Sequence, residues 1–236
     1  MRPLLIIVFL INIGIATGQN FSYPAVKNEG MTFTDFIPVG WTIKDSVSGD
    51  LNNDKNNDLV IVLQLNDSIK LIKQEGNYTD TVTTQPRILL ILFRNLPANK
   101  FILAEQSNSF ILNHDNPTIE DPYQSIKINQ GILQIDFQLF SNMGSWSVTS
   151  TSYKFQYQDK DFVLIGADNN SFNRSTNDYE NYSYNFLTNK WSLTKGNDNS
   201  NRKPKTKRHS LDLKKLKTLK TFKQPYTWEV TKDIYL

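Results

Sequence analysis

The 236-residue chain contains no cysteine and only two histidines, His114 and His209. Without cysteine the chain forms no disulfide and carries no cysteine to which a lipid anchor could be attached. An exported protein of this size without disulfides is unusual for an animal secretory route and ordinary for a bacterial envelope. Histidine is so scarce that catalytic or metal-binding clusters have few places to form. His114 stands beside Asp115 and near Glu120 and Asp121 in one polar stretch, which leaves a small acid–base or metal cluster there as an open alternative to plain surface.

Long hydrophobic runs are also missing, apart from one at the N-terminus. Residues Leu4–Ile15 form an apolar stretch that follows Arg2 and precedes the small residues Ala16 to Gly18. This arrangement is typical of a secretory signal peptide, and the stretch is shorter than the roughly 20 residues of a membrane span. We therefore expect residues 1–18 to be a signal peptide and the remainder to be secreted or periplasmic, with an uncleaved anchor as the alternative.

Charge is unevenly distributed along the chain. The range Arg202–Lys223 holds ten Lys or Arg residues and one acidic residue, whereas all other positions together hold 16 basic and 22 acidic residues. The division predicts a mainly β domain over 19–201 and a basic C-terminal segment over 202–236, docked on that domain. Residues 197–207 are expected to be mobile.

The basic segment also carries apolar residues at spacings close to three, which predicts a short amphipathic helix that begins near Ser210. These residues are Leu211, Leu213, Leu216, Leu219 and Phe222. Two interpretations stay open: the lysines bind an anionic surface such as lipid or polysaccharide, or the leucines dock on the domain and the lysines face solvent. Nucleic acid is not expected as a partner, because the chain is exported and aromatics are not interleaved with the basic run that precedes Phe222.

The central part of the chain alternates between apolar and polar residues, with turns rich in Asn, Asp and Gly. This pattern predicts short antiparallel strands, so the fold class is mainly β, an antiparallel sandwich or curled β meander with little helix. Ser68–Gln85 is polar with a turn at Gly76-Asn77, and residues 168–181 read as a long loop. Strands are expected at Trp41–Val47, Leu59–Leu65, Pro86–Arg94, Lys100–Gln106, Gln124–Asn129, Ile132–Phe140, Trp146–Gln158, Asp161–Ala167, Tyr182–Phe186 and Lys190–Lys195.

Oxygen-bearing side chains recur between Gly49 and the apolar strand that begins at Leu59. Hard cations such as Ca²⁺ take about 6–8 oxygen ligands, and a short loop supplies them from alternate positions. No Cys or His is interleaved, which favours calcium over zinc. The predicted metal ligands are Asp50, Asn52, Asp54, Asn56 and Asp58, with Asn56 contributing its backbone carbonyl. The alternative is a solvated Asx-rich turn that binds no ion.

The stretch GDLNNDKNNDLVIV (49–62) resembles the calcium loop of FG-GAP and VCBS-type repeats, whose pattern is approximately G-D-x-N-x-D-G-x-x-D followed by a hydrophobic residue. Lys55 stands where that pattern has glycine, at the sharp bend. The chain also resembles a group of secreted bacterial proteins of uncharacterised function, through FIPVGW (36–41), RILLIL (87–92), DPYQSIKINQG (121–131) and the stretch 144–166. The loop motif occurs once, which argues against a β-propeller, since each blade would carry its own copy.

The sequence does not identify a catalytic group. His209, Ser210 and Asp212 are triad residue types, but such close neighbours in one element cannot take up triad geometry. Asp136 lies in an apolar strand and is expected to face away from the core and to be simply exposed. The leading hypothesis is therefore a monomeric, non-enzymatic binding domain of the cell envelope, whose ligand is an envelope polysaccharide or another protein. The rival hypothesis is an envelope-polymer hydrolase that uses a pair of carboxylates from distant parts of the chain.

Overall fold

The computed structural model describes residues 21–75 and 78–236. The predicted signal peptide and the turn predicted at Gly76-Asn77 lie outside the described residues. The described chain is built from β-strands and one short 3-10 turn, η1 (Phe33–Phe36), so the prediction of a mainly β fold is confirmed. No helix in this part of the chain is long and apolar enough to cross a membrane.

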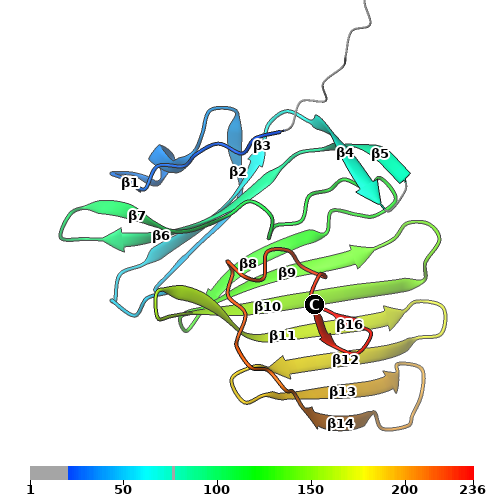
Figure 1. The fold of residues 1–236 in the computed structure, drawn as a ribbon. Helices are drawn as coiled ribbons and strands as arrows, with labels where there is room; N and C mark the ends of the chain where they lie inside the picture. Colours follow the sequence, from blue (N-terminus) through cyan, green and yellow to red (C-terminus); the bar gives the residue numbers. More distant parts are fainter. Residues whose placement is uncertain (1–20, 76–77) are drawn as a thin grey trace, which may run out of the picture.

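Two antiparallel sheets carry the fold, and Figure 1 shows one above the other. The five-stranded sheet has the order β1-β7-β6-β3-β2, and the seven-stranded sheet runs as a meander from β8 to β14. Two small hairpins, β4-β5 and β15-β16, lie outside them. The strands of the five-stranded sheet are β1 (Glu29–Gly30), β2 (Trp41–Gly49), β3 (Asp58–Leu65), β6 (Arg87–Asn95) and β7 (Lys100–Ser107). Those of the seven-stranded sheet are β8 (Tyr123–Asn129), β9 (Ile132–Phe140), β10 (Ser147–Gln158), β11 (Asp161–Asn173), β12 (Asp178–Asn185), β13 (Lys190–Asn197) and β14 (Lys205–Ser210). The hairpins are β4 (Ile69–Glu75) with β5 (Tyr78–Thr84), and β15 (Glu229–Thr231) with β16 (Ile234–Tyr235).

The five-stranded sheet is buried on both faces, which explains its continuous apolar strands. Val60 and Val62 of β3 point into the core between the sheets, while Ile61 and Leu63 point to the opposite side. That opposite side is covered by the N-terminal segment, including Phe36. Strands that are covered on both faces read as unbroken hydrophobic runs rather than alternating ones.

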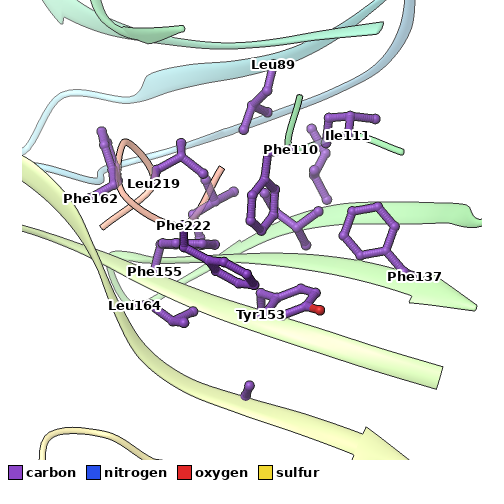
Figure 2. Close-up of a cluster of buried hydrophobic side chains, with 14 of the residues drawn as sticks. Leu89, Phe110, Ile111, Phe137, Tyr153, Phe155, Phe162, Leu164, Leu219 and Phe222 are labelled. Atoms are coloured by element: carbon purple, nitrogen blue, oxygen red, sulfur yellow. The ribbon is translucent and has the colours of Figure 1, made fainter. Parts of the chain in front are cut away.

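The described residues cover the seven-stranded sheet on one face only. Along β9 and β10 the buried residues alternate with polar ones, so that Phe137 and Tyr153 face the core and their neighbours face outward. Figure 2 shows Phe110, Tyr153 and Phe155 within the core cluster, and the rings of Phe110 and Phe155 meet edge to face with centroids 5.2 Å apart. A sheet of this kind has an apolar face for the core and a polar face for water or a ligand.

The C-terminal segment crosses the core face of the seven-stranded sheet as extended chain and turns (Figure 1). The prediction of an amphipathic helix over 211–222 was wrong. The backbone of Lys217 and Leu219 instead bonds to Leu164 and Phe162 of β11, beyond the point where β12 ends. An exposed strand edge leaves N–H and C=O groups unpaired, and the segment satisfies them. Leu219 and Phe222 are each 2% exposed and lie in the core.

Two further predictions need correction. Residues 168–181 are not a long loop, because β11 continues to Asn173 and β12 begins at Asp178. Within the stretch 197–207, expected to be mobile, residues from Lys205 onward form the edge strand β14, which pairs with β13. In both cases polar strands were missed, because they bury little apolar surface and so show no hydrophobic alternation. The polar stretch Ser68–Gln85, for which the sequence predicted a turn and no strands, contains the β4-β5 hairpin.

Candidate functional site

The Asp-rich loop joins β2 to β3 and lies against the seven-stranded sheet. Leu51 within it is fully buried in the core. A Cβ atom placed on Gly49 would come within 2.7 Å of Ile128, and one on Gly131 would lie 3.6 Å from the Asn53 amide oxygen. The loop therefore packs against the β8-β9 hairpin, so that anything that rigidifies it also fixes the contact between the two sheets.

Hydrogen bonds within the loop hold a tight turn. Asp50 accepts a hydrogen bond from the Lys55 backbone N–H at 2.9 Å, Asn52 accepts one from Asp54 at 3.0 Å, and Asp54 accepts one from Asn56 at 2.8 Å. Lys55 has a φ of 70°, in the left-handed region where the resembling calcium loops have glycine. The bend expected from the sequence is therefore present, although a lysine occupies it.

Asp58 is fully buried at the start of β3. One carboxylate oxygen accepts a bond from Leu51 N–H at 2.9 Å and the other accepts one from Arg94 N–H at 3.0 Å. Burial raises the pKa of Asp58, and the nearby charges of Asp54 and Asp50 add to that rise against the lowering effect of the two N–H bonds. Asp58 thus connects the loop to β6. A cation bound in the loop would reduce the electrostatic repulsion among the carboxylates of Asp50, Asp54 and Asp58.

One feature of the loop fits a cation. The Asp50 Oδ1 atom is buried and has no hydrogen-bond partner among the residues that the structure describes, which is costly for a carboxylate oxygen unless something electropositive meets it. Across residues 21–75 and 78–236, no three His, Asp or Glu side chains converge as a metal-holding group. Amide and main-chain oxygens, such as those of Asn52 and Asn56, would have to complete the shell.

A second candidate site lies on the outer face of the seven-stranded sheet. It is a groove of about 580 Å³, open to solvent, which crosses strands β9 to β12. Its lining combines amides, hydroxyls and half-buried rings with one cation and one carboxylate. The lining residues are Gln138, Phe140, Val148, Ser150, Asn170, Ser171, Phe172, Arg174, Tyr179, Asn181 and Asp198.

Arg174 fixes one end of this groove. Its guanidinium group lies over the Phe140 ring at 4.3 Å and over the Trp146 ring at 5.8 Å. The same Nη2 atom donates to the backbone carbonyls of Ser141 and Ser145, at 3.1 and 2.9 Å. These bonds hold the loop between β9 and β10 in place and leave Trp146 65% exposed beside the groove. An exposed tryptophan that is held in position is well suited to contact a ligand.

Next to the groove, the outer face carries a satisfied polar network. Asp136 faces away from the core, yet its carboxylate accepts bonds from Lys127, Gln134 and Ser152, and also from Ser125. Burial raises its pKa, but these bonds outweigh that effect and lower it. The expectation that Asp136 is simply exposed therefore needs correction, because its side chain is only 14% exposed.

The catalytic candidates are distributed over different environments. His114, Asp115 and Glu120 line one pocket of about 360 Å³, and His114 Nε2 lies 2.8 Å from the Ile119 carbonyl oxygen. His209 stacks on Trp191, with ring centroids 4.4 Å apart. Asp121 is engaged by Arg87 at 2.6 and 2.7 Å. Burial alone would raise the pKa of Asp121, but Arg87 and then Lys44 lower it to about 2.

The sequence did not mark the outer-face groove, because the residues that β11 and β12 contribute to it, such as Asn170 and Asn181, were interpreted as loop. The stretch 168–173 shows no alternation of apolar and polar residues that would have marked it as a strand. Comparison of the chain with family models, curated proteins and solved structures finds no match.

Proposed function

We propose that the protein is an exported, non-enzymatic binding domain that holds a neutral polysaccharide on the outer face of its seven-stranded sheet. The observation that carries the proposal is the composition of the groove. Three amide side chains, Gln138, Asn170 and Asn181, lie among aromatic rings on a face that the fold leaves uncovered. The apolar run Leu4–Ile15 supports export.

Amides and rings together match the surface of a sugar. Each Asn or Gln side chain offers two donors and an acceptor, so it can bond to hydroxyl groups in either direction. Flat rings such as Phe140 and Tyr179 offer apolar area to the C–H face of a pyranose. The groove carries Arg174 and Asp198 as its charged residues, of opposite sign, so a neutral ligand suits it better than a strongly charged one. Its open shape suits an internal stretch of polymer rather than a small molecule, which is normally enclosed.

The same lining supports binding rather than hydrolysis. Glycoside hydrolysis requires two carboxylates on either side of the scissile bond. Of the described residues that line the groove, Asp198 is the one carboxylate. The rival hydrolase hypothesis has a separate location, the pocket where Asp115 and Glu120 both contribute to the lining.

The Asp-rich loop has a supporting role in this proposal. A calcium ion held by Asp50, Asn52, Asp54, Asn56 and Asp58 would meet the unpartnered Asp50 Oδ1 and fix the β2-β3 loop against the β8-β9 hairpin. The ion is not proposed to take part in a reaction. It would stabilise the folded protein, because it would bind to the folded state alone.

The test is affinity gel electrophoresis of the mature protein in gels that contain dextran, laminarin or xyloglucan, with a sedimentation assay on purified peptidoglycan sacculi alongside. Retardation by at least one polymer is expected, and Trp146→Ala and the pair Asn170→Ala/Asn181→Ala should each abolish most of it. Tyr235→Ala is the matched control, because Tyr235 is also an exposed aromatic, at 50%, and lies outside the groove. Unchanged mobility of the wild-type protein in every polymer would reject the proposal. Release of reducing sugar that is lost in Glu120→Gln would favour the hydrolase.

A further inference from the structure

A polar pocket of about 420 Å³ lies where the five-stranded sheet meets the β4-β5 hairpin. Its lining is contributed by the ends of several strands and by the loop before β8, and is almost wholly polar. The lining residues are Lys44, Gln64, Ser68, Thr83, Thr84, Gln85, Arg87, His114 and Asp121. None of them lines the outer-face groove, so the two sites are separate.

Arg87 and Asp121 form the base of this pocket. The Arg87 side chain is 3% exposed and makes a two-pronged ion pair with Asp121, with N–O distances of 2.6 and 2.7 Å. Lys44 Nζ reaches the same carboxylate at 3.0 Å. Two cations therefore face one carboxylate, and the base of the pocket keeps a net charge of +1.

Among the described residues that line this pocket, the charged side chains have N–H donors without a hydrogen-bond partner. Within the part of the chain that the structure describes, Arg87 makes four bonds with its five N–H groups, two to Asp121 and the other two to Gln64 Oε1 and the Leu112 carbonyl. Lys44 has three N–H donors, and within the described residues one of them has a partner. The Gln85 amide N–H groups are already taken by the carbonyls of Leu65 and Asn66. An incoming group must therefore supply acceptor oxygens.

Thr84 gives independent evidence that something is bound. The residue is 2% exposed, and its Oγ1 atom has no hydrogen-bond partner in the described part of the chain. A buried hydroxyl left without a partner is destabilising, so native proteins rarely keep one without a reason. Thr84 lines the same pocket as Lys44 and Arg87, and an oxygen ligand there would give its hydroxyl a partner.

We propose that this pocket is a binding site for a small oxyanion, a carboxylate or phosphate group, held by Lys44, the free Arg87 N–H and the Thr84 hydroxyl. The net positive charge selects an anion. The unused donors select one with several acceptor oxygens, because charge-assisted bonds to carboxylate and phosphate are the stronger class. Asp121 does not oppose the ligand, since its charge is already balanced by Arg87.

The test measures thermal unfolding of the mature protein in increasing sodium phosphate, sodium acetate and sodium sulfate, each against sodium chloride at equal ionic strength. At least one oxyanion should raise the melting temperature where chloride does not, and isothermal titration should then give its Kd. Stabilisation by phosphate but not acetate would assign the site to phosphate groups, and the reverse would assign it to carboxylates.

Two variants make the test specific. Lys44→Met and Thr84→Val should each weaken oxyanion binding by about tenfold, the effect of losing one charge-assisted or buried hydrogen bond. Thr84→Val has nearly the same shape and removes the unpaired hydroxyl, so the ligand-free protein should stay folded and be at least as stable as the wild type. Lys190→Met and Thr206→Val, on exposed positions of the other sheet, are the controls. Equal shifts in chloride, or unchanged affinity in both pocket variants, would overturn the proposal.

Discussion

The Tyr179 ring of β12 lies across the backbone of Gly196 on the neighbouring strand β13. The two residues are paired in register, and a Cβ atom built on Gly196 would come within 2.8 Å of the Tyr179 Cε1 atom and closer still to its hydroxyl oxygen. No side chain larger than hydrogen fits beneath the ring. Glycine in a strand interior weakens the strand, and a common reason to find it there is close approach by another group. Here it lets the hydroxyl end of Tyr179, a residue that lines the groove, lie over the backbone of β13.

This relationship gives the first prediction. Gly196→Ala should lift the Tyr179 ring from β13 and weaken polysaccharide binding by roughly 2- to 10-fold, the range expected when the contact of one ring is disturbed. Tyr179→Ala should weaken it by at least as much. The measurement is the relative mobility in affinity gels against polymer concentration. If Gly196→Ala bound as well as the wild type while Tyr179→Ala did not bind, the position of the ring over Gly196 would be irrelevant to recognition.

Calcium is the subject of the second prediction. Millimolar calcium should raise the melting temperature of the wild-type protein, because ligand that binds the folded state alone stabilises it by mass action. Asp50→Asn should remove most of this response, since it neutralises the carboxylate whose Oδ1 atom has no partner. Magnesium at the same concentration controls for ionic strength. A melting temperature that calcium leaves unchanged would mean that the loop is an Asx-rich turn without an ion.

Lys55→Gly gives a third prediction about the same loop. Lys55 has a φ of 70°, and a left-handed conformation costs a residue other than glycine about 1–2 kcal/mol. Glycine avoids this cost, but it loses more conformational entropy on folding, which offsets part of the gain. The variant should be more stable by up to about 1 kcal/mol and should bind calcium more tightly, because a positive charge has left the site. Urea unfolding with and without calcium measures both effects. Lys190→Gly would place a glycine within a strand and is therefore not a useful control. Asn53→Gly is used instead, because Asn53 also has a positive φ, of 61°.

Hydrophobic patterning predicted the parts of this fold that bury apolar surface. The strand expected at Ile132–Phe140 has those bounds in the structure, and the apolar runs at Leu59–Leu65 and Pro86–Arg94 became β3 and β6. The same reasoning failed for the C-terminal leucines. Their spacing of three is compatible with a helix, but the free edge of β11 at Phe162–Leu164 offers backbone bonds that a helix could not use. Tertiary pairing decided the conformation, and no local pattern encodes it.

The candidate sites also differ in how far the sequence alone predicts them. The Asp-rich loop was visible because its residues are contiguous, and its bend at Lys55 could be anticipated. The outer-face groove and the oxyanion pocket gather residues from several strands, so their composition appears only after the strands are placed in register. The amides Asn170 and Asn181, for example, are 11 positions apart in sequence and are paired neighbours across β11 and β12.

The Arg87–Asp121 pair gives a prediction about acid stability. The pKa of Asp121 is about 2 in the folded protein and about 3.9 in an unfolded chain, so the pair stabilises the fold above about pH 4 and this contribution is lost as the pH falls towards 2. With a third of the Asp121 side chain exposed, the pH-dependent part should be roughly 1–2 kcal/mol. Asp121→Asn should destabilise the protein at pH 7 by about 3 kcal/mol, because it leaves a buried guanidinium unpaired, and by less at pH 2.

Denaturant unfolding of both proteins between pH 2 and pH 7 measures this difference. Asp161→Asn is the comparison variant, since Asp161 pairs with Lys220 at the surface and should change stability by less than about 1 kcal/mol. A difference between Asp121→Asn and wild type that stays constant across the pH range would show that the carboxylate does not titrate as described.

The last prediction concerns the C-terminal segment, where the sequence left docking and surface binding as alternatives. Phe222 is 2% exposed and its ring meets those of Phe110 and Tyr153, at centroid distances of 5.7 and 5.4 Å. Phe222→Ala should therefore destabilise the whole domain by about 3–5 kcal/mol, the cost of a cavity in a packed core. The double variant Lys214→Gln/Lys215→Gln, at exposed positions of the same segment, should change stability by less than about 0.5 kcal/mol. A single cooperative transition in which Phe222→Ala lowers the midpoint would show that the segment folds with the sheets. If Phe222→Ala unfolded at the wild-type midpoint, the segment would have to be bound too weakly to count as part of the core, and its lysines would then be available to an anionic surface.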